Sequence, residues 1–404
     1  MAVRVRKRAV GRLIGSATCT VLLVLGLPAG AGYAAADGEP PTLPTVTDEC
    51  VGPSPVPFAG VPWPVARLAP QAVWPLSRGG GVTVAVVDTG VSAAATGLTG
   101  VVLPGRDVVA GGRADRDCRG RGTALAGIVA ARPVTGTGVV GVAPAVSVLP
   151  VRIVDGQGRL QPRYLADGIR AAVSLGADVI LVGTGVEAPD ANLRAAVDEA
   201  VARDIVLVAA ISDQRGASQA GAPVVWYPAG FPQVVAVGGI DADGRPTEPV
   251  VEESGVDLVA PGVAAVSVGP SGAGHYRIGG AAVAAAYVAG AAALVRSYRP
   301  ALGAAEIRTR LELTAEHPPG AARTPALGAG VLDPYAAVSV VDPGQAARPV
   351  EARPAPAVLP VVPPADPAVG RAGLVGAAVG VGTVLALAAG VTIRAGRRRR
   401  WRVR

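Results

Sequence analysis

The first quarter of the chain contains the run Val84-Ala-Val-Val-Asp-Thr-Gly-Val91, an apolar stretch that ends in a carboxylate and a turn. A short apolar run of this kind, bounded by glycines, is typical of a strand that is buried on both faces. Such strands belong to parallel sheets, whose active sites lie at the carboxyl ends of the strands. The run therefore predicts a parallel α/β fold with Asp88 at a candidate site.

The chain continues as apolar runs that alternate with Ala-rich helical stretches. The expected strands are Val82–Val87, Val146–Ile153, Ala177–Val182, Ile205–Ala210, Val234–Gly239 and Leu258–Ala260. The expected helices are Thr123–Ala131, Leu165–Leu175, Ala191–Arg203, Ala281–Arg296 and Ala304–Thr314. This alternation predicts a doubly wound parallel sheet with helices on both faces. The long apolar run Ile278–Val295 also has the length of a membrane span, but its Ala and Gly content favours a central buried helix.

Charge is concentrated at the two ends of the chain. The sequence has 37 basic and 30 acidic residues, and twelve of the basic ones lie within residues 4–12 and 394–404. Without these twelve, 25 basic residues face the 30 acidic ones, so the middle of the chain is mildly acidic. Basic clusters that flank apolar stretches are a membrane-topology pattern, and we therefore expect no nucleic-acid binding.

Both apolar flanks are typical of membrane targeting. Residues 1–36 combine a basic start, an apolar run and Ala34-Ala-Ala36, which predicts a cleaved signal peptide, with a retained anchor as the alternative. Residues 372–393 form an uncharged stretch long enough to cross a bilayer, and the arginines after it predict a cytoplasmic tail. We therefore expect a single-pass protein of the cell membrane whose N-terminal body lies outside the cytoplasm.

The expected domain order follows from these boundaries. The segments are a signal peptide (1–36), an N-terminal extension (37–80), the α/β body (81–340), a Pro-rich linker (341–371), a transmembrane helix (372–393) and a basic cytoplasmic tail (394–404). Of the three cysteines, Cys19 leaves with the signal peptide. In an oxidising compartment we expect Cys50 and Cys118 to form a disulfide; two free thiols are the alternative.

Several further motifs resemble the subtilisin-like serine proteases in order and spacing. They include Gly138-Val-Val-Gly-Val-Ala-Pro144, Tyr227-Pro-Ala-Gly-Phe-Pro-Gln-Val-Val-Ala-Val-Gly-Gly239 and Gly280-Ala-Ala-Val-Ala-Ala-Ala-Tyr-Val-Ala-Gly290. The two membrane signals, the cysteine in an N-terminal extension, the Pro-rich spacer and Gly330-Val-Leu-Asp-Pro-Tyr335 are similar to the mycosins. Mycosins are membrane-anchored subtilases of the type VII secretion systems of actinobacteria.

The catalytic positions implied by this resemblance are degenerate. Asp88 occupies the Asp position, but Arg121 stands where the family has His and Ala282 where it has Ser. Asp213 occupies the position of the oxyanion-hole Asn, and Gly183-Thr-Gly185 lies where the family lines its substrate cleft. Alanine has no nucleophilic atom, and arginine stays protonated and cannot act as a general base. In subtilisin, loss of Ser or His costs about 10⁶ in turnover, so proteolysis by the family mechanism should be negligible.

No other residues visibly replace the missing groups. The chain has two histidines. His275 is expected on a strand or turn before the Ser helix, as a surface or loop residue rather than a relocated base, and His317 in a loop. Ser212 and Thr184 could line the cleft, but nothing activates them. We expect neither a cofactor nor a metal site.

The family fold implies one specific contact. Its Asp and His are hydrogen-bonded, so an arginine in the second position can reach Asp88. Because a buried unpaired carboxylate is costly, we predict a charge-assisted pair between Arg121 and Asp88. The alternative places Arg121 in solvent.

Three functions remain open at this point. The first is an inactive mycosin-like subtilase retained for assembly or stability of a type VII secretion membrane complex, its cleft able to hold a peptide uncut. The second is an active serine-type endopeptidase that uses a non-standard constellation. The third is a surface binding module without a secretion partner.

Overall fold

The computed structural model describes residues 38–45, 49–212, 224–251, 255–317, 324–341 and 367–398. The expected signal peptide, most of the expected linker and the end of the expected tail lie outside these residues. The chain divides into two compact units, residues 1–348 and 349–404.

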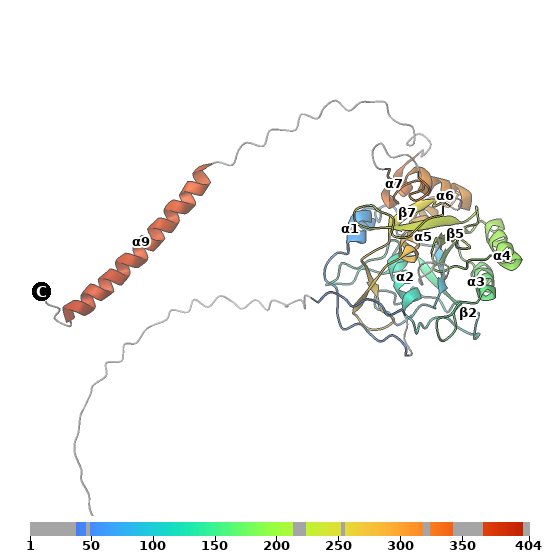
Figure 1. Cartoon of the computed structure of the whole chain (residues 1–404), viewed down its shortest axis with the longest axis horizontal. Coiled ribbons are helices and arrows are strands. Elements are labelled where there is room, and N and C mark those ends of the chain that lie inside the picture. The colour runs from blue at the N-terminus through green and yellow to red at the C-terminus, as the bar shows by residue number, and fades with distance from the viewer. Residues whose placement is uncertain are drawn as a thin grey trace, which may run out of the picture. The chain divides into compact units, whose positions relative to one another are not determined.

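The first unit is built around a parallel sheet (Figure 1). Among the described residues its strand order is β2-β3-β1-β4-β5-β6-β7, and every pairing is parallel. The strands are β1 Thr83–Asp88, β2 Arg106–Asp107, β3 Ser147–Arg152, β4 Val179–Val182, β5 Val206–Ala210, β6 Val235–Ile240 and β7 Leu258–Pro261. A separate antiparallel hairpin joins β8 (Ala265–Val268) and β9 (His275–Ile278). The predicted doubly wound sheet is therefore confirmed.

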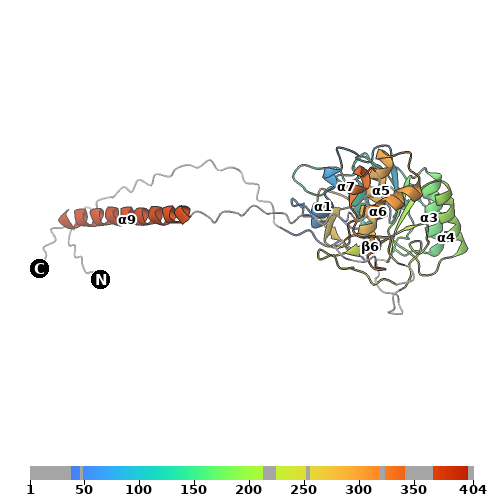
Figure 2. The same cartoon turned by 90° about the horizontal axis from the view of Figure 1, so that it is seen from above.

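Helices cover both faces of this sheet. The helices of the first unit are α1 Trp63–Leu68, α2 Arg121–Ala130, α3 Pro162–Ser174, α4 Ala191–Ala202, α5 Ala281–Tyr298, α6 Ala304–Leu313 and α7 Pro334–Ser339, with a 3₁₀ turn at Pro70–Ala72. Helices α3 and α4 lie side by side on one face (Figure 2). Helices α2 and α5 pack on the other face.

Strand β1 shows why its sequence is apolar throughout. Successive side chains of a strand point to opposite faces. Val84 and Val86 join the core cluster of α2 and α5, while Ala85 and Val87 join the cluster of α3 and α4. Because both faces are buried, the strand reads as a continuous apolar run rather than an alternating one.

Helix α5 is the central buried helix that was expected. Its long apolar run passes a length and composition test for a membrane span, but 78% of it is buried inside the body. Gly290 permits this close packing, because a Cβ there would lie 2.7 Å from the side chain of Val142.

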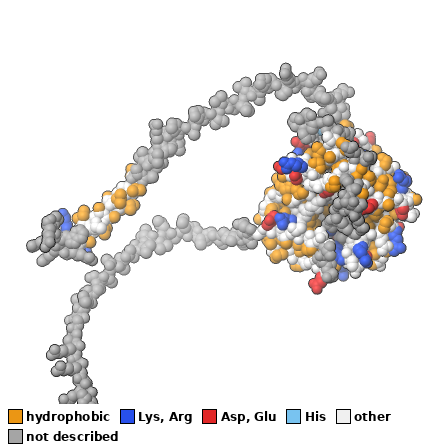
Figure 3. All heavy atoms as spheres, in the orientation of Figure 1, with side chains coloured by type: hydrophobic (Ala, Val, Ile, Leu, Met, Phe, Trp, Pro, Cys, Tyr) orange, Lys and Arg blue, Asp and Glu red, His pale blue; other side chains and the backbone are white. Residues whose placement is uncertain are grey.

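The second unit contains helix α9, Pro367–Arg398. Residues 379–398 of this helix pass the same test, and 6% of that window is buried, so it is a candidate membrane span. Apolar side chains lie along this part of α9 and arginines near its end (Figure 3). The helix begins earlier and ends later than the expected span 372–393, which was set by the absence of charge between Arg371 and Arg394 and not by helix-end signals.

Candidate functional site

Asp88 is the last residue of β1 and lies at the carboxyl end of the sheet. Its side chain is fully buried. The backbone N–H of Thr89 donates a 2.8 Å hydrogen bond to its Oδ1. The sequence thus delivers this carboxylate where ligand sites of parallel sheets are found.

Arg121 is the first residue of α2. The start of this helix is fixed by a second buried carboxylate, that of Asp117. Asp117 accepts hydrogen bonds from the backbone N–H of Arg119, Gly120 and Thr123 and from the hydroxyl of Thr123, at 2.7 to 3.0 Å. Burial raises the pKa of Asp117, and these hydrogen bonds act in the opposite direction. Gly120 precedes the helix with φ +78°, a conformation that favours glycine.

Arg121 and Asp88 form the predicted pair. The Arg121 Nε donates to Asp88 Oδ1 at 2.9 Å, and its Nη2 lies 2.8 Å from Oδ2. The exposed fractions of the two side chains are 11% and 0%. The guanidinium thus contacts both carboxylate oxygens in a buried setting, through a charge-assisted hydrogen bond to Oδ1 and an ion-pair contact with Oδ2. The alternative with Arg121 in solvent is wrong.

Such a pair cannot perform the proton transfer of a serine protease. The guanidinium is permanently protonated and has no acceptor atom, so it cannot take a proton from a nucleophile.

Ala282 is the second residue of α5 and is partly buried against the main core cluster. Just before it, Gly280 has φ +99° and donates its N–H to the carbonyl of Gly262 at 2.6 Å. Helix α5 packs against β1 and β4, the strands that lead to Asp88 and to Gly183. The position offers a methyl group and no hydroxyl.

The segment Gly183-Thr184-Gly185 follows β4 and is buried. A Cβ at Gly183 would lie 2.5 Å from Asp88 Oδ2 and 2.7 Å from Leu125 Cδ1. The absence of a side chain at this position therefore allows the backbone after β4 to lie close to the Asp88 carboxylate. Beyond it, Val186 and Tyr227 exchange two backbone hydrogen bonds of 2.9 and 2.8 Å. Asp213 lies outside the described residues, and Ser212 is the half-buried last residue before that gap.

The two histidines do not form a substitute base. His275 is 5% exposed on β9, so the expectation of a surface or loop residue is wrong. Its Nδ1 accepts the backbone N–H of Phe58 at 3.0 Å, and burial lowers its pKa. His317 is exposed in a loop, as expected, with Nδ1 3.0 Å from the carbonyl of Ala315.

The N-terminal extension is bound to the body beside this site. A disulfide joins Cys50 to Cys118, three residues before Arg121, which confirms the predicted bridge. The N–H of Leu43 donates to the carbonyl of Arg277 on β9 at 2.9 Å. The Leu43 side chain packs with Ala124 of α2, so the extension contacts the first turn of the helix that carries Arg121.

Sequence reasoning missed the role of Asp117. Asp117 lies three residues before the N-cap Gly120 of α2, outside the position where a capping side chain is expected, so the local sequence did not mark it. Within the part of the chain that the structure describes, no group of three or more His, Cys, Asp or Glu side chains could hold a metal ion.

Known proteins share both the sequence pattern and the architecture. A model of the subtilase family matches residues 79–336. Subtilisin DY of Bacillus licheniformis is 36% identical over 59% of this chain and 85% of its own length. Mycosin-4 of Mycobacterium tuberculosis is 34% identical over 73% of both chains.

Solved structures give the same result. The structure of a serine protease, MycP1, described as an essential component of the type VII (ESX-1) secretion system, is 30% identical with a TM-score of 0.63. It covers 75% of this chain and 100% of its own. A MycP1 structure from Mycobacterium smegmatis is also 30% identical, with a TM-score of 0.63 over 77% of this chain and 94% of its own. The chain therefore belongs to the subtilase family, and the mycosins are among its relatives.

Proposed function

We propose that this protein is a catalytically inactive mycosin-like subtilase that acts as a structural component of a type VII secretion membrane complex. The observation that carries the proposal is the buried two-point contact between Arg121 and Asp88. By the resemblance to the subtilases, Arg121 would hold a permanent cation at the position of the family's base, and Ala282 would supply no nucleophile. The likeness to the mycosins supports the secretion setting.

The body would stand outside the cytoplasm, held by α9. The candidate span has the length of a bilayer crossing, and the arginines that follow it favour a cytoplasmic end. The cleft beside Gly183, Thr184 and Gly185 would still accept an extended peptide through backbone hydrogen bonds, without cutting it.

A fluorophosphonate probe tests the inactivity. This reagent reacts with activated serines, so the full chain purified in detergent should remain unlabelled while a subtilisin in the same tube is labelled. Stoichiometric labelling would instead establish an endopeptidase with a non-standard constellation.

A second experiment tests the structural role. Deletion of the gene in its own host should reduce the amount of intact secretion complex on a native gel. Re-expression of the full chain should restore it. An unchanged complex in the deletion strain would refute the assembly role and leave a free-standing surface module.

A further inference from the structure

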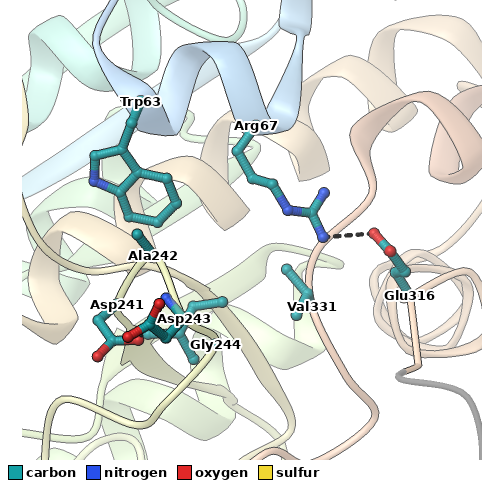
Figure 4. A pocket seen from close by; sticks show the side chains of 9 residues that line it. Trp63, Arg67, Asp241, Ala242, Asp243, Gly244, Glu316 and Val331 are labelled. Carbon is teal, nitrogen blue, oxygen red and sulfur yellow. Dashed lines mark hydrogen bonds and ion pairs between the residues drawn. The ribbon is translucent and has the colours of Figure 1, made fainter.

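A pocket lies between α1 and the turn that follows β6 (Figure 4). Its volume is about 270 Å³. Pockets that hold whole small molecules usually have volumes of about 300–1,000 Å³. The pocket therefore has room for one long side chain rather than for a larger ligand.

An aromatic ring forms one wall of this pocket. Trp63 projects from the start of α1 over the turn at Ala242 (Figure 4). Its Nε1 donates to the carbonyl of Val263 at 2.9 Å, which fixes the ring, and the side chain is only half-buried. A fixed, partly exposed indole face attracts a cation through its quadrupole.

Carboxylates form the opposite wall. Asp241 is held in place because its Oδ1 accepts the backbone N–H of Asp243 at 2.9 Å and of Arg245 at 2.8 Å. Asp243 is 65% exposed and pairs with Arg245, whose own side chain is 71% exposed. An exposed pair of this kind contributes little, so an entering cation could replace Arg245 at small cost.

The remaining wall is electrically balanced and partly apolar. Arg67, the basic residue that lines the pocket, is paired with Glu316 at 2.6 Å (Figure 4). Ile240 and Val331 supply apolar surface for an aliphatic stem. With Arg67 paired to Glu316, the two aspartates Asp241 and Asp243 share one cation, Arg245, which lies 3.9 Å from Asp241 and also pairs with Asp243, so this wall keeps a net negative charge.

We propose that this pocket receives an arginine side chain from a partner polypeptide. The planar guanidinium can stack on Trp63 and donate two parallel hydrogen bonds to a carboxylate, which a lysine ammonium cannot do. The apolar surface of Ile240 and Val331 takes the methylene stem. The proposal concerns a surface separate from the Asp88–Arg121 pair and holds whether or not that site cleaves peptides.

Fluorine NMR of the full chain in detergent tests this contact. The four tryptophans are labelled as 5-fluorotryptophan, and Trp63→Phe identifies the Trp63 signal. The probe is the blocked peptide acetyl-Gly-Arg-Gly-amide, and its citrulline analogue is the neutral control. A single cation–π contact with one charged hydrogen-bond pair gives a Kd on the order of millimolar.

The expected result is a saturable shift of the Trp63 signal alone with the arginine peptide and none with citrulline. Asp243→Asn should weaken the binding at least about threefold, whereas Asp167→Asn, which changes an exposed carboxylate on α3, should not. The unchanged signals of the other tryptophans report that each variant is folded. No shift, or an equal shift with citrulline, would overturn the proposal. A third peptide, acetyl-Gly-Lys-Gly-amide, should bind more weakly, and an equal response to it would refute the preference for arginine.

Discussion

Replacing Arg121 by alanine should destabilise the body strongly. Asp88 is fully buried, and the substitution removes its contacts of 2.9 and 2.8 Å with Arg121, while the backbone N–H of Thr89 still donates to its Oδ1. Removal of one member of a buried pair costs about 3–5 kcal/mol, because the other charge stays buried without compensation. For a body of this size the midpoint of thermal unfolding should fall by roughly 6–20 °C.

A double-mutant cycle isolates the pair itself. If the loss comes from an uncompensated charge, Asp88→Ala together with Arg121→Ala should be more stable than the sum of the single changes predicts, by at least about 2 kcal/mol. The assay is unfolding of the full chain in detergent, followed by tryptophan fluorescence and near-ultraviolet circular dichroism. Arg203→Ala is the matched control, because Arg203 pairs with Glu199 on the surface of α4 and should cost less than about 1 kcal/mol. If Arg121→Ala costs no more than Arg203→Ala, or if the two single effects simply add, the reasoning is refuted.

Three further predictions concern the extension, pH and the missing catalytic groups. Replacing Cys50 and Cys118 by serine removes a disulfide that joins two residues 68 positions apart in the sequence. The free energy of unfolding should fall by about 4 kcal/mol in the loop-entropy model. An equal unfolding midpoint for the parent and the variant would contradict this. Burial lowers the pKa of His275, so the folded protein holds this residue neutral. The free energy of unfolding of the parent should therefore fall as the pH drops below ~6.5, the pKa of histidine in the unfolded chain, and His275→Leu should reduce this dependence. An identical pH dependence of the two proteins between pH 7 and pH 5 would show that His275 does not contribute. The double variant Arg121→His with Ala282→Ser restores the side chains of the triad. It should react with a fluorophosphonate at least about 10²-fold more slowly than the triple variant that also carries Asp213→Asn, because the carboxylate of Asp213 would oppose the developing oxyanion. Equal labelling rates would show that Asp213 does not act at the oxyanion.

Much of the sheet could be predicted because its signal is local. Strands such as β1 and β5 are buried on both faces, so each reads as an apolar run that ends where a turn residue or a polar side chain begins. The predicted ends of these strands agree with the structure to within about a residue or two. The predicted contact between Arg121 and Asp88 came from the family resemblance and not from such local patterns.

The elements that sequence reasoning missed depend on contacts between distant segments. Strand β9 was not among the expected strands, and His275 was expected on a strand or turn as a surface or loop residue. Its backbone is instead paired with β8 and with the N-terminal extension, where His275 N–H donates to Val56 and Arg277 N–H to Pro41. A histidine can be buried there because the N–H of Phe58, more than 200 residues away in sequence, needs an acceptor.

The identity of residue 121 follows from the burial of Asp88. The glycine at 183 lets the chain after β4 pass close to the carboxylate, whose side chain has no exposed surface, so an unpaired charge there would be buried. An alanine or leucine at position 121 would leave that charge unpaired, whereas arginine pairs with it and has no acceptor atom that could take a proton. On the proposed function, this one side chain would both stabilise the fold and prevent the family's proton transfer. Asp88 should tolerate neutralisation only when Arg121 is changed with it.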